Sequence, residues 1–488
     1  MNQPIRTMAI FCMVLFVALM LNTTYLQYVS TGDLNARDDN KRVRDAEFSR
    51  KRGAILAGEK AIAESVASGD QYKYQRVYRE PFKYAHLTGF YSYIYGREAV
   101  ELSENEILSG SDPRLFVDRV VDMIGNSQPK GGSVSLSVVP AAQDAAFEGL
   151  RALNERAEGA VVALDPSTGK ILAMASSPSY DPNVLSSHDF SDVQEDRERL
   201  VTDETKPMNN RAAQELYPPG STFKLVTAAA ALESGDYRPD SLVQGGVSLD
   251  LPQTDKDLPN YGGSDCGGTR ITLTQALMTS CNVSFGSLGL ELGDAALRAQ
   301  AEKFGFGDTY LEDLGRQAVS EFPPGDVDDP LTAYSAIGQY DVRATPLQMA
   351  MIAAGIGNGG TVMRPYLVDE VRAPNLSPLE KTEPVEYGAA VSSSVARDLT
   401  EMMVAVVEDG TGTTAQIPGI EVAGKTGTAQ SQADRPPYAW FASFAPADDP
   451  QVAVAVLVED AGVARDAITG SGLAAPIAKS VMEAVINQ

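Results

Sequence analysis

The chain carries the segment Tyr217-Pro-Pro-Gly-Ser-Thr-Phe-Lys224, which leads directly into the apolar stretch Leu225-Val-Thr-Ala-Ala-Ala-Ala-Leu232. Prolines and a glycine ahead of an apolar stretch mark the start of a helix. Positions i and i+3 of a helix lie on one face, so the Ser221 hydroxyl can meet the Lys224 amine. The helix N-terminus adds unpaired N–H groups and the positive end of the dipole. The segment therefore predicts a buried helix that begins with a candidate nucleophile and its base.

Lys224 can act as a base near neutral pH only if its pKa is lowered. A free lysine has a pKa of about 10.4. Burial and a second cation can lower that pKa by about 3 units, at a cost of roughly 4 kcal/mol of folding free energy. The neutral amine could then take the proton from the Ser221 hydroxyl. Taken alone, the motif also fits an ordinary serine at a helix start with a lysine whose stem lies along the surface.

A second Ser-x-x-Lys occurs in Ser167-Thr-Gly-Lys170. It belongs to the turn Asp165-Pro-Ser-Thr-Gly169, which joins two apolar strands of a predicted hairpin. A serine and a lysine in such a turn share no helical face. We therefore interpret this copy as structural.

Two further motifs follow Ser221 in the chain. Ser280-Cys-Asn282 lies in a predicted loop after the helical stretch 271–277, and Lys425-Thr-Gly-Thr428 lies on a predicted strand after Val422-Ala-Gly424. Each motif is common by itself. The ordered set of all three is rare, and it is typical of penicillin-binding proteins and class A β-lactamases.

The five catalytic candidates fit one acyl-transfer reaction. Ser221 would attack a peptide carbonyl, and Ser280 could relay protons between Lys224 and the leaving amine. Asn282 can hold the substrate amide. Lys425 supplies positive potential that keeps Lys224 neutral and attracts an anionic substrate.

The residues after Lys425 are candidates for substrate binding. Thr426 and Thr428 can donate hydrogen bonds to a terminal carboxylate, and Gly427 lets the substrate backbone approach the strand. The backbone N–H groups of Ser221 and Thr428 are the predicted oxyanion hole.

Composition excludes several classes of function. The chain has 488 residues, enough for two or three domains, and a formal net charge of −25. That charge argues against nucleic-acid binding, which needs clustered Lys and Arg. The two histidines, His86 and His188, lie far apart and outside metal-ligand spacing. We therefore predict neither a metal nor another cofactor.

The three cysteines differ in their surroundings. Cys12 lies in an apolar stretch and is predicted to be inert. Cys266 and Cys281 close a short loop and could form a disulfide worth roughly 3 kcal/mol in an oxidising compartment. Two free thiols fit the same spacing, so both alternatives stay open.

The N-terminus carries an uncharged apolar run from Met8 to Leu21, which Tyr25 and Tyr28 extend with an interfacial aromatic pair. Its length also fits the core of a secretory signal, but no small-x-small cleavage site follows. We predict a transmembrane signal anchor over 8–29 after a cytoplasmic tail over 1–7. A simple charge count would place the bulk of the chain inside, since one basic residue precedes the span and several follow it: Arg6, then Arg37, Lys41, Arg42 and Arg44. Long domains translocate largely regardless of such charges, so we predict an extracytoplasmic body.

The remaining chain divides at a turn signal, Pro129-Lys-Gly-Gly132. Residues 30–132 are polar and rich in tyrosine, without a nucleophile motif, and predict a small non-catalytic α+β domain. Residues 133–488 have strands at both ends and helices between them, which predicts one mixed α/β (α+β) domain whose sheet joins distant segments. The expected elements are a helix over 112–125, a strand over 133–139, a helix over 140–157, strands over 159–164 and 170–175, helices over 273–354, strands within 421–460 and a helix over 475–486.

The motifs together resemble the class B penicillin-binding proteins, especially their actinobacterial members. The resemblance rests on segments spread over most of the chain, in the family's order: Asn35-Ala-Arg37, Arg52-Gly-Ala-Ile55, Tyr95-Gly-Arg97 to Glu101, Leu108-Ser-Gly110, Ala163-Leu-Asp-Pro-Ser-Thr-Gly169, Ser177-Pro-Ser-Tyr-Asp-Pro-Asn183, Tyr217 to Lys224, Gly338-Gln-Tyr340, Ala344-Thr-Pro-Leu-Gln348, Asn358-Gly-Gly360 and Gly424-Lys-Thr-Gly-Thr428. The chain departs from the family at Glu98, which replaces a small residue, and at Ala99, which replaces a glycine.

The resemblance implies a penicillin-binding transpeptidase fold, with a five-stranded antiparallel sheet between helices, an all-helical subdomain and a pedestal or dimerisation-like N-terminal domain. It implies a peptidoglycan D,D-transpeptidase that cross-links stem peptides ending in D-Ala-D-Ala during growth or division, is acylated by β-lactams and uses no cofactor. Membrane glycosyltransferases and division or elongation proteins are the implied partners.

Other functions remain as alternatives. Residues 30–132 are too few for a glycosyltransferase module, so the enzyme would be monofunctional. No Glu-x-x-Leu-Asn element follows Ser280, which argues against a hydrolysing β-lactamase. A β-lactam-sensing receptor and a non-catalytic cell-wall assembly scaffold are the two rival readings.

Overall fold

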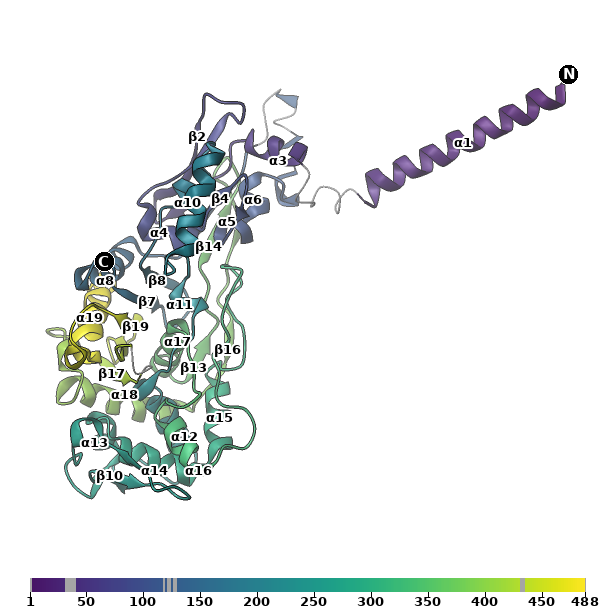
Figure 1. Ribbon diagram of the computed structural model, residues 1–488. Coiled ribbons are helices and arrows are strands. Elements are labelled where there is room, and N and C mark those ends of the chain that lie inside the picture. Colours follow the sequence, from purple (N-terminus) through teal and green to yellow (C-terminus); the bar gives the residue numbers. More distant parts are fainter. Residues whose placement is uncertain are drawn as a thin grey trace.

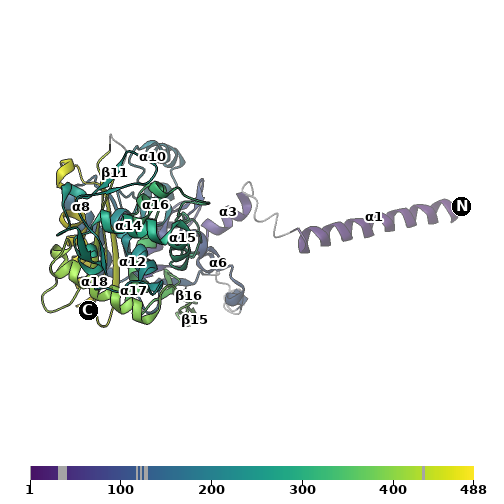
Figure 2. The same ribbon diagram turned by 90° about the horizontal axis from the view of Figure 1, so that it is seen from below.

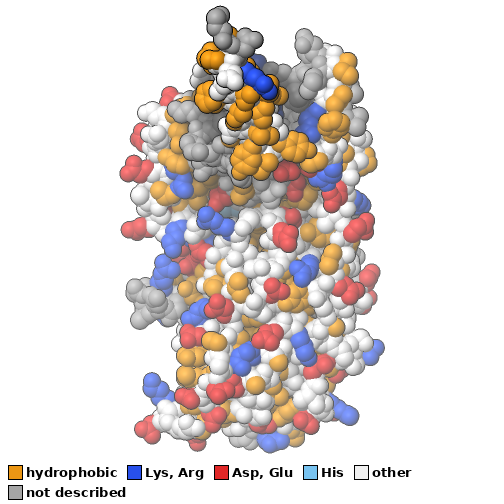
Figure 3. Space-filling view, turned by 90° about the vertical axis from the view of Figure 1, so that its right-hand side faces the viewer, with side chains coloured by type: hydrophobic (Ala, Val, Ile, Leu, Met, Phe, Trp, Pro, Cys, Tyr) orange, Lys and Arg blue, Asp and Glu red, His pale blue; other side chains and the backbone are white. Residues whose placement is uncertain are grey.

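The computed structural model describes residues 2–30, 41–116, 119–120, 124–125, 130–430 and 435–487. Helix α1 (Asn2–Tyr28) stands apart from an elongated body, in which the N-terminal sheet, the central sheet and a helical region follow one another (Figure 1). Residues Gln3–Tyr28 are long and apolar enough to cross a membrane. In Figure 3 hydrophobic side chains gather at the top of the view, whereas acidic and basic side chains are interspersed over the rest of that face.

The central sheet is five-stranded and antiparallel, with the order β17-β18-β19-β7-β8. Its strands come from both ends of the domain: β7 (Glu158–Leu164), β8 (Ile171–Ser177), β17 (Ala423–Ala429), β18 (Tyr438–Ala445) and β19 (Val452–Asp460). Val161 packs with one hydrophobic cluster and the adjacent Val162 with another, so both faces of the sheet are buried. Burial on both faces explains why the strands other than β17 have nearly continuous apolar sequences.

Helices cover the two faces of the central sheet. α8 (Pro140–Leu153) and α19 (Ala475–Ile486) pack together on one face. The other face is covered by α17 (Pro346–Gly357), with α18 (Ser393–Glu408) beside β17, and α12 (Lys224–Glu233) packs on α18.

A second sheet of six strands has the order β15-β14-β6-β1-β2-β3. Three strands precede residue 132 and three follow it: β1 (Ile55–Ala57), β2 (Lys60–Ala67), β3 (Tyr74–Tyr78), β6 (Ser133–Leu136), β14 (Val368–Arg372) and β15 (Pro378–Lys381). β6 pairs in parallel with β1 and antiparallel with β14. Strands from both sides of the boundary expected between residues 132 and 133 therefore share one sheet. The alternating pattern of residues 133–139 predicted a strand, but such a pattern does not specify which strands it pairs with.

The N-terminal part is held by a buried ion cluster around Glu101, which is fully buried on α5 (Val100–Ser103). Its carboxylate accepts hydrogen bonds from Arg52 Nε at 2.6 Å, Arg76 Nε at 2.6 Å and the Tyr78 hydroxyl at 3.1 Å. The remaining elements here are α3 (Lys41–Phe48), α4 (Pro81–Thr88), β4 (Tyr91–Ser92), β5 (Gly96–Arg97), α6 (Asn105–Ser109), α9 (Asn183–Ser186) and α10 (Phe190–Thr202).

The helical region at the far end contains α12, α13 (Leu273–Met278), α14 (Asn282–Leu292), α15 (Asp294–Lys303) and α16 (Asp329–Ala336) (Figure 1). Four of these helices, α12, α14, α15 and α16, lie together in the view from below (Figure 2). It also carries two short ribbons, β9 (Leu242–Gln244) with β12 (Arg270–Thr272) and β10 (Ser248–Asp250) with β11 (Asp257–Pro259). A further ribbon joins β13 (Thr361–Met363) to β16 (Glu386–Ala389).

Several boundaries differ from those expected. The hairpin of β7 and β8 and the final helix over 475–486 are confirmed. The helix expected over 140–157 ends at Leu153, because Asn154 is extended, and the strand expected over 133–139 ends at Leu136. The helix expected over 112–125 begins as a 3₁₀ turn at Pro113–Leu115. The rest of that helix falls partly outside the described residues, and Asn35-Ala-Arg37 falls wholly outside them.

Candidate active site

Ser221 lies in a 3₁₀ turn, Gly220–Thr222, immediately before α12. Two hydrogen bonds hold the prolines of this turn: Thr222 Oγ1 donates to the Pro219 carbonyl at 2.6 Å, and Trp440 Nε1 donates to the Pro218 carbonyl at 3.0 Å. The chain at the expected helix start thus forms a 3₁₀ turn, which is tighter than a turn of α-helix. Trp440 of strand β18 stabilises it through the hydrogen bond to Pro218.

Gly338 lets a second segment approach the nucleophile turn closely. Its φ is +72°, and a Cβ built on it would lie 2.2 Å from the Gly220 carbonyl oxygen. The Gly220 N–H donates to the Gly338 carbonyl at 2.9 Å. Any side chain at position 338 would displace the turn that carries Ser221.

The Lys224 amine lies at the centre of the candidate site and is fully buried. Nζ donates to the Ser280 carbonyl at 2.7 Å and to Asn282 Oδ1 at 2.7 Å, and it lies 3.4 Å from Ser280 Oγ. Within the part of the chain that the structure describes, no carboxylate forms an ion pair with it. A neutral amine would use its two N–H groups on these two acceptors and keep one lone pair for an incoming proton.

Ser280 connects the two lysines of the site. It lies between α13 and α14 with a φ of +58°, a left-handed conformation that turns its carbonyl toward Lys224. Lys425 Nζ, on β17, donates to Ser280 Oγ at 2.9 Å and to the Thr426 carbonyl at 2.9 Å. The Ser280 hydroxyl therefore lies between the two lysine amines, where it can relay a proton to or from Lys224.

Burial lowers the pKa of both lysines. The pKa of Lys224 falls well below its ordinary value because its amine is buried and because the charge of Lys425 lies nearby. Burial lowers the pKa of Lys425 to about 7. Two cations so close in a dry site cannot both keep their protons at little cost. Lys224 is the group that loses its proton first, because burial and the neighbouring charge of Lys425 both disfavour its ammonium form.

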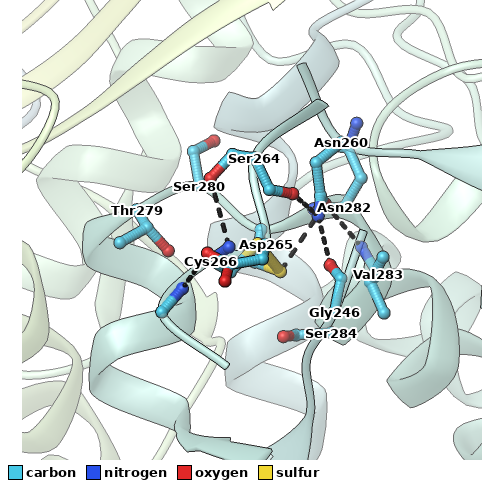
Figure 4. The surroundings of a disulfide bond; sticks show 12 residues. Gly246, Asn260, Ser264, Asp265, Cys266, Thr279, Ser280, Asn282, Val283 and Ser284 are labelled. Carbon is cyan, nitrogen blue, oxygen red and sulfur yellow. Dashed lines mark hydrogen bonds between the residues drawn. A yellow bond between two sulfur atoms is a disulfide. The ribbon is translucent and has the colours of Figure 1, made fainter. Parts of the chain in front are cut away.

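Asn282 is the first residue of α14, not a loop residue as expected. Its Nδ2 donates to the Pro259 carbonyl at 2.9 Å, which directs Oδ1 toward Lys224. Cys281, which precedes it, is joined to Cys266 in a disulfide with a Cα–Cα distance of 5.8 Å (Figure 4).

Strand β17 brings the three candidate binding residues beside the nucleophile turn. Gly427 lies so close that a Cβ there would meet Thr222 Cγ2 at 3.0 Å and the Pro219 carbonyl at 3.2 Å. Thr426 is 7% exposed, and its hydroxyl lies 2.6 Å from the Thr411 hydroxyl. Thr428, two residues further on, is half-buried.

The second Ser-x-x-Lys has no part in this site. Ser167 Oγ donates to Asp165 Oδ1 at 2.7 Å within the hairpin turn, and Lys170 forms an ion pair with Asp369 at 2.9 Å. The turn hydrogen bond and the ion pair account for both side chains.

The site also contains residues that the sequence did not single out: Thr411, Trp440 and Asn260. A possible signal for Thr411 was its place between two glycines, Gly410 and Gly412, shortly before Lys425. Trp440 and Asn260 carried no signal, because only the pairing of β17 with β18 and the path of the segment 246–264, which contains β10 and β11, bring them here. Among the described residues, no group of three His, Cys, Asp or Glu side chains could hold a metal ion.

Comparison with known proteins assigns the class. Residues 159–483 match the penicillin-binding protein transpeptidase domain, and residues 52–134 match the penicillin-binding protein A dimerisation domain. The chain therefore belongs to the penicillin-binding protein transpeptidase family.

Within that family it is similar to the peptidoglycan D,D-transpeptidase PbpA of Mycolicibacterium smegmatis, with 43% identity over the whole of both chains. It is also 43% identical to the PbpA of Mycobacterium tuberculosis, over 100% of this chain and 99% of that protein. The solved structure of penicillin-binding protein A from M. tuberculosis as a ceftriaxone acyl-enzyme superposes with a TM-score of 0.87, covering 91% of this chain and 100% of that one.

Proposed function

We propose that this protein is a monofunctional peptidoglycan D,D-transpeptidase that cross-links stem peptides through an acyl-enzyme on Ser221. The carrying observation is the Lys224 amine, which is buried, has a lowered pKa and is held by the Ser280 carbonyl and Asn282 Oδ1. A neutral amine three residues after Ser221 can act as the base that activates a serine hydroxyl for acyl transfer.

The proposed acylation runs through these groups. Lys224 takes the proton of Ser221 as its oxygen bonds to the penultimate D-Ala carbonyl carbon. The proton then passes through the Ser280 hydroxyl to the amine of the terminal D-Ala, and the C–N bond breaks. An acceptor amine of a second stem peptide attacks the ester by the reverse proton path and releases Ser221. A β-lactam amide would acylate Ser221 by the same attack.

Residues of strand β17 would bind the negatively charged terminus of the substrate. The terminal carboxylate would bind beside Lys425 and accept hydrogen bonds from Thr426 and Thr428, with Gly427 admitting the substrate backbone. The carboxylate also favours protonated Lys425, which further disfavours a proton on Lys224. The backbone N–H groups of Ser221 and Thr428 would bind the oxyanion.

The N-terminal helix would anchor the enzyme in the cell membrane with its body on the extracytoplasmic face. The disulfide supports this location, because such bonds persist in oxidising compartments. Cell-wall cross-linking there would bring the enzyme together with membrane glycosyltransferases and with division or elongation proteins.

Labelling with a fluorescent penicillin tests the nucleophile. We expect Ser221→Ala to fold normally and to lose labelling entirely, whereas Ser167→Ala, the matched control in the other Ser-x-x-Lys, labels like the native protein. Labelling that persists in Ser221→Ala would refute the assignment. Growth supported by Ser221→Ala in cells that lack the native enzyme would favour the scaffold reading instead.

A further inference from the structure

Asn260 is a buried asparagine that contacts the Ser280-Cys-Asn282 motif from outside it. It follows β11 and is 6% exposed. Its Oδ1 accepts from the backbone N–H groups of Asn282 at 2.8 Å and Val283 at 3.1 Å. Figure 4 shows its side chain beside these two residues.

These two hydrogen bonds replace a missing helix cap. The residue before α14 is Cys281, whose side chain makes no capping hydrogen bond and whose sulfur is committed to the disulfide with Cys266. The first N–H groups of a helix need an acceptor, and Asn, Asp, Ser or Thr at the cap position normally supply it. Here Asn260, 21 residues upstream of Cys281, supplies it instead.

The other half of the amide fixes its orientation. Nδ2 donates to the Gly246 carbonyl at 2.7 Å and to the Ser264 carbonyl at 2.7 Å. A flipped amide would face two N–H donors with its own NH₂ and two carbonyls with its oxygen. The preceding residue, Pro259, accepts from Asn282 Nδ2 at 2.9 Å. Adjacent residues at the end of β11 thus hold both the backbone and the side chain of Asn282.

We propose that Asn260 is a positioning residue for acylation. It holds the start of α14 so that Asn282 Oδ1 stays 2.7 Å from Lys224 Nζ and keeps one N–H group of the amine engaged. This inference rests on the proposed function. The two can fail separately. If only this inference is wrong, Ser221 of Asn260→Ala will be labelled by penicillin at the native rate, whereas if the proposed function is wrong, Ser221 of the native protein will not be labelled.

Three variants test the proposal through the second-order rate constant for acylation by a chromogenic cephalosporin, with the unfolding temperature measured in parallel. We expect Asn260→Ala to slow acylation by about tenfold to a hundredfold, because small displacements of reacting groups cost that much. Asn260→Asp keeps the acceptor at the positive end of α14, so its acylation rate should stay within about fivefold of native. Its second oxygen faces the Gly246 and Ser264 carbonyls, so we expect a lower unfolding temperature. Asn183→Ala is the control: Asn183 also bridges two segments, accepting from and donating to the Tyr78 backbone, and should leave the rate unchanged.

A double variant separates positioning from general loosening. If Asn260 acts through Asn282, Asn260→Ala combined with Asn282→Ala will acylate no more slowly than Asn282→Ala alone. The proposal would be overturned if the rate losses of the two single variants multiply in the double variant, or if Asn260→Ala acylates at the native rate. Should Asn260→Ala not fold, Asn260→Asp decides alone: a near-native rate supports the cap, and a loss as large as that of Asn282→Ala refutes it.

Discussion

Lys224 and Lys425 converge on one hydroxyl: Ser280 Oγ lies 3.4 Å from Lys224 Nζ and 2.9 Å from Lys425 Nζ. Both lysines are fully buried. Buried like charges force their pKa values apart, which makes one group a base and leaves the other the cation. The functional division between the two lysines therefore arises from their proximity and shared burial.

Removing the charge of Lys425 should shift the pH dependence of acylation. The charge of Lys425 lowers the pKa of Lys224, so in Lys425→Met the pKa of Lys224 rises and the acidic limb of the rate profile moves to higher pH. The profile of acylation rate against pH measures this, apart from any uniform loss of rate through weaker carboxylate binding. Lys170→Met, in the surface ion pair with Asp369, serves as the control and should leave the profile in place. A Lys425→Met profile with an unmoved acidic limb would contradict the coupling.

His86 should make the protein sensitive to acid. Burial lowers its pKa to about 4, and its Nε2 lies 2.9 Å from the Pro207 carbonyl. Between the unfolded pKa near ~6.5 and about 4, the unfolded state binds a proton that the folded state does not, so stability falls as pH falls. This loss is on the order of 3 kcal/mol over that interval. Urea unfolding at pH 7 and pH 4.5 should show a smaller difference in His86→Gln than in the native protein, and equal differences would contradict the assignment.

Glu101→Gln should strongly destabilise the N-terminal sheet. It leaves Arg52 and Arg76 buried without their shared carboxylate, and breaking a buried ion pair costs about 3–5 kcal/mol. The matched surface variant is Glu64→Gln, whose partner Arg79 is largely exposed, and it should cost no more than about 1 kcal/mol. Chemical denaturation measures both. Equal costs would show that burial does not set the strength of the Glu101 cluster.

Ala99→Gly should stabilise the protein although it removes a methyl group from the core. Ala99 has φ 50° and ψ −135°, a backbone conformation that glycine adopts and L side chains rarely do. Relief of such strain is worth roughly 1–3 kcal/mol, offset by about 1 kcal/mol of lost methyl burial and added chain entropy. A thermal midpoint raised above that of the native protein is the expected result. A clear drop would mean that packing of the Ala99 methyl outweighs the strain.

Much of the architecture could be predicted from local patterns. The hairpin around Asp165–Gly169 and the closing helix from residue 475 follow from periodicity and turn residues, which act over short distances. The three motifs were also recognisable, because each packs its polar residues into a few consecutive positions. Their order along the chain sufficed to indicate acyl transfer.

Pairings across long sequence distances could not be predicted in this way. The partners of β6, the bracing of Pro218 by Trp440 and the capping of α14 by Asn260 depend on which segments meet, and no local pattern encodes that. The same holds for the lysines, since residues 224 and 425 become coupled only when β17 lies beside the nucleophile turn. The residue types of the three motifs determined the class of reaction that could be predicted. Burial and proximity exist only in the folded chain, and they determine which of the two lysine amines acts as the base.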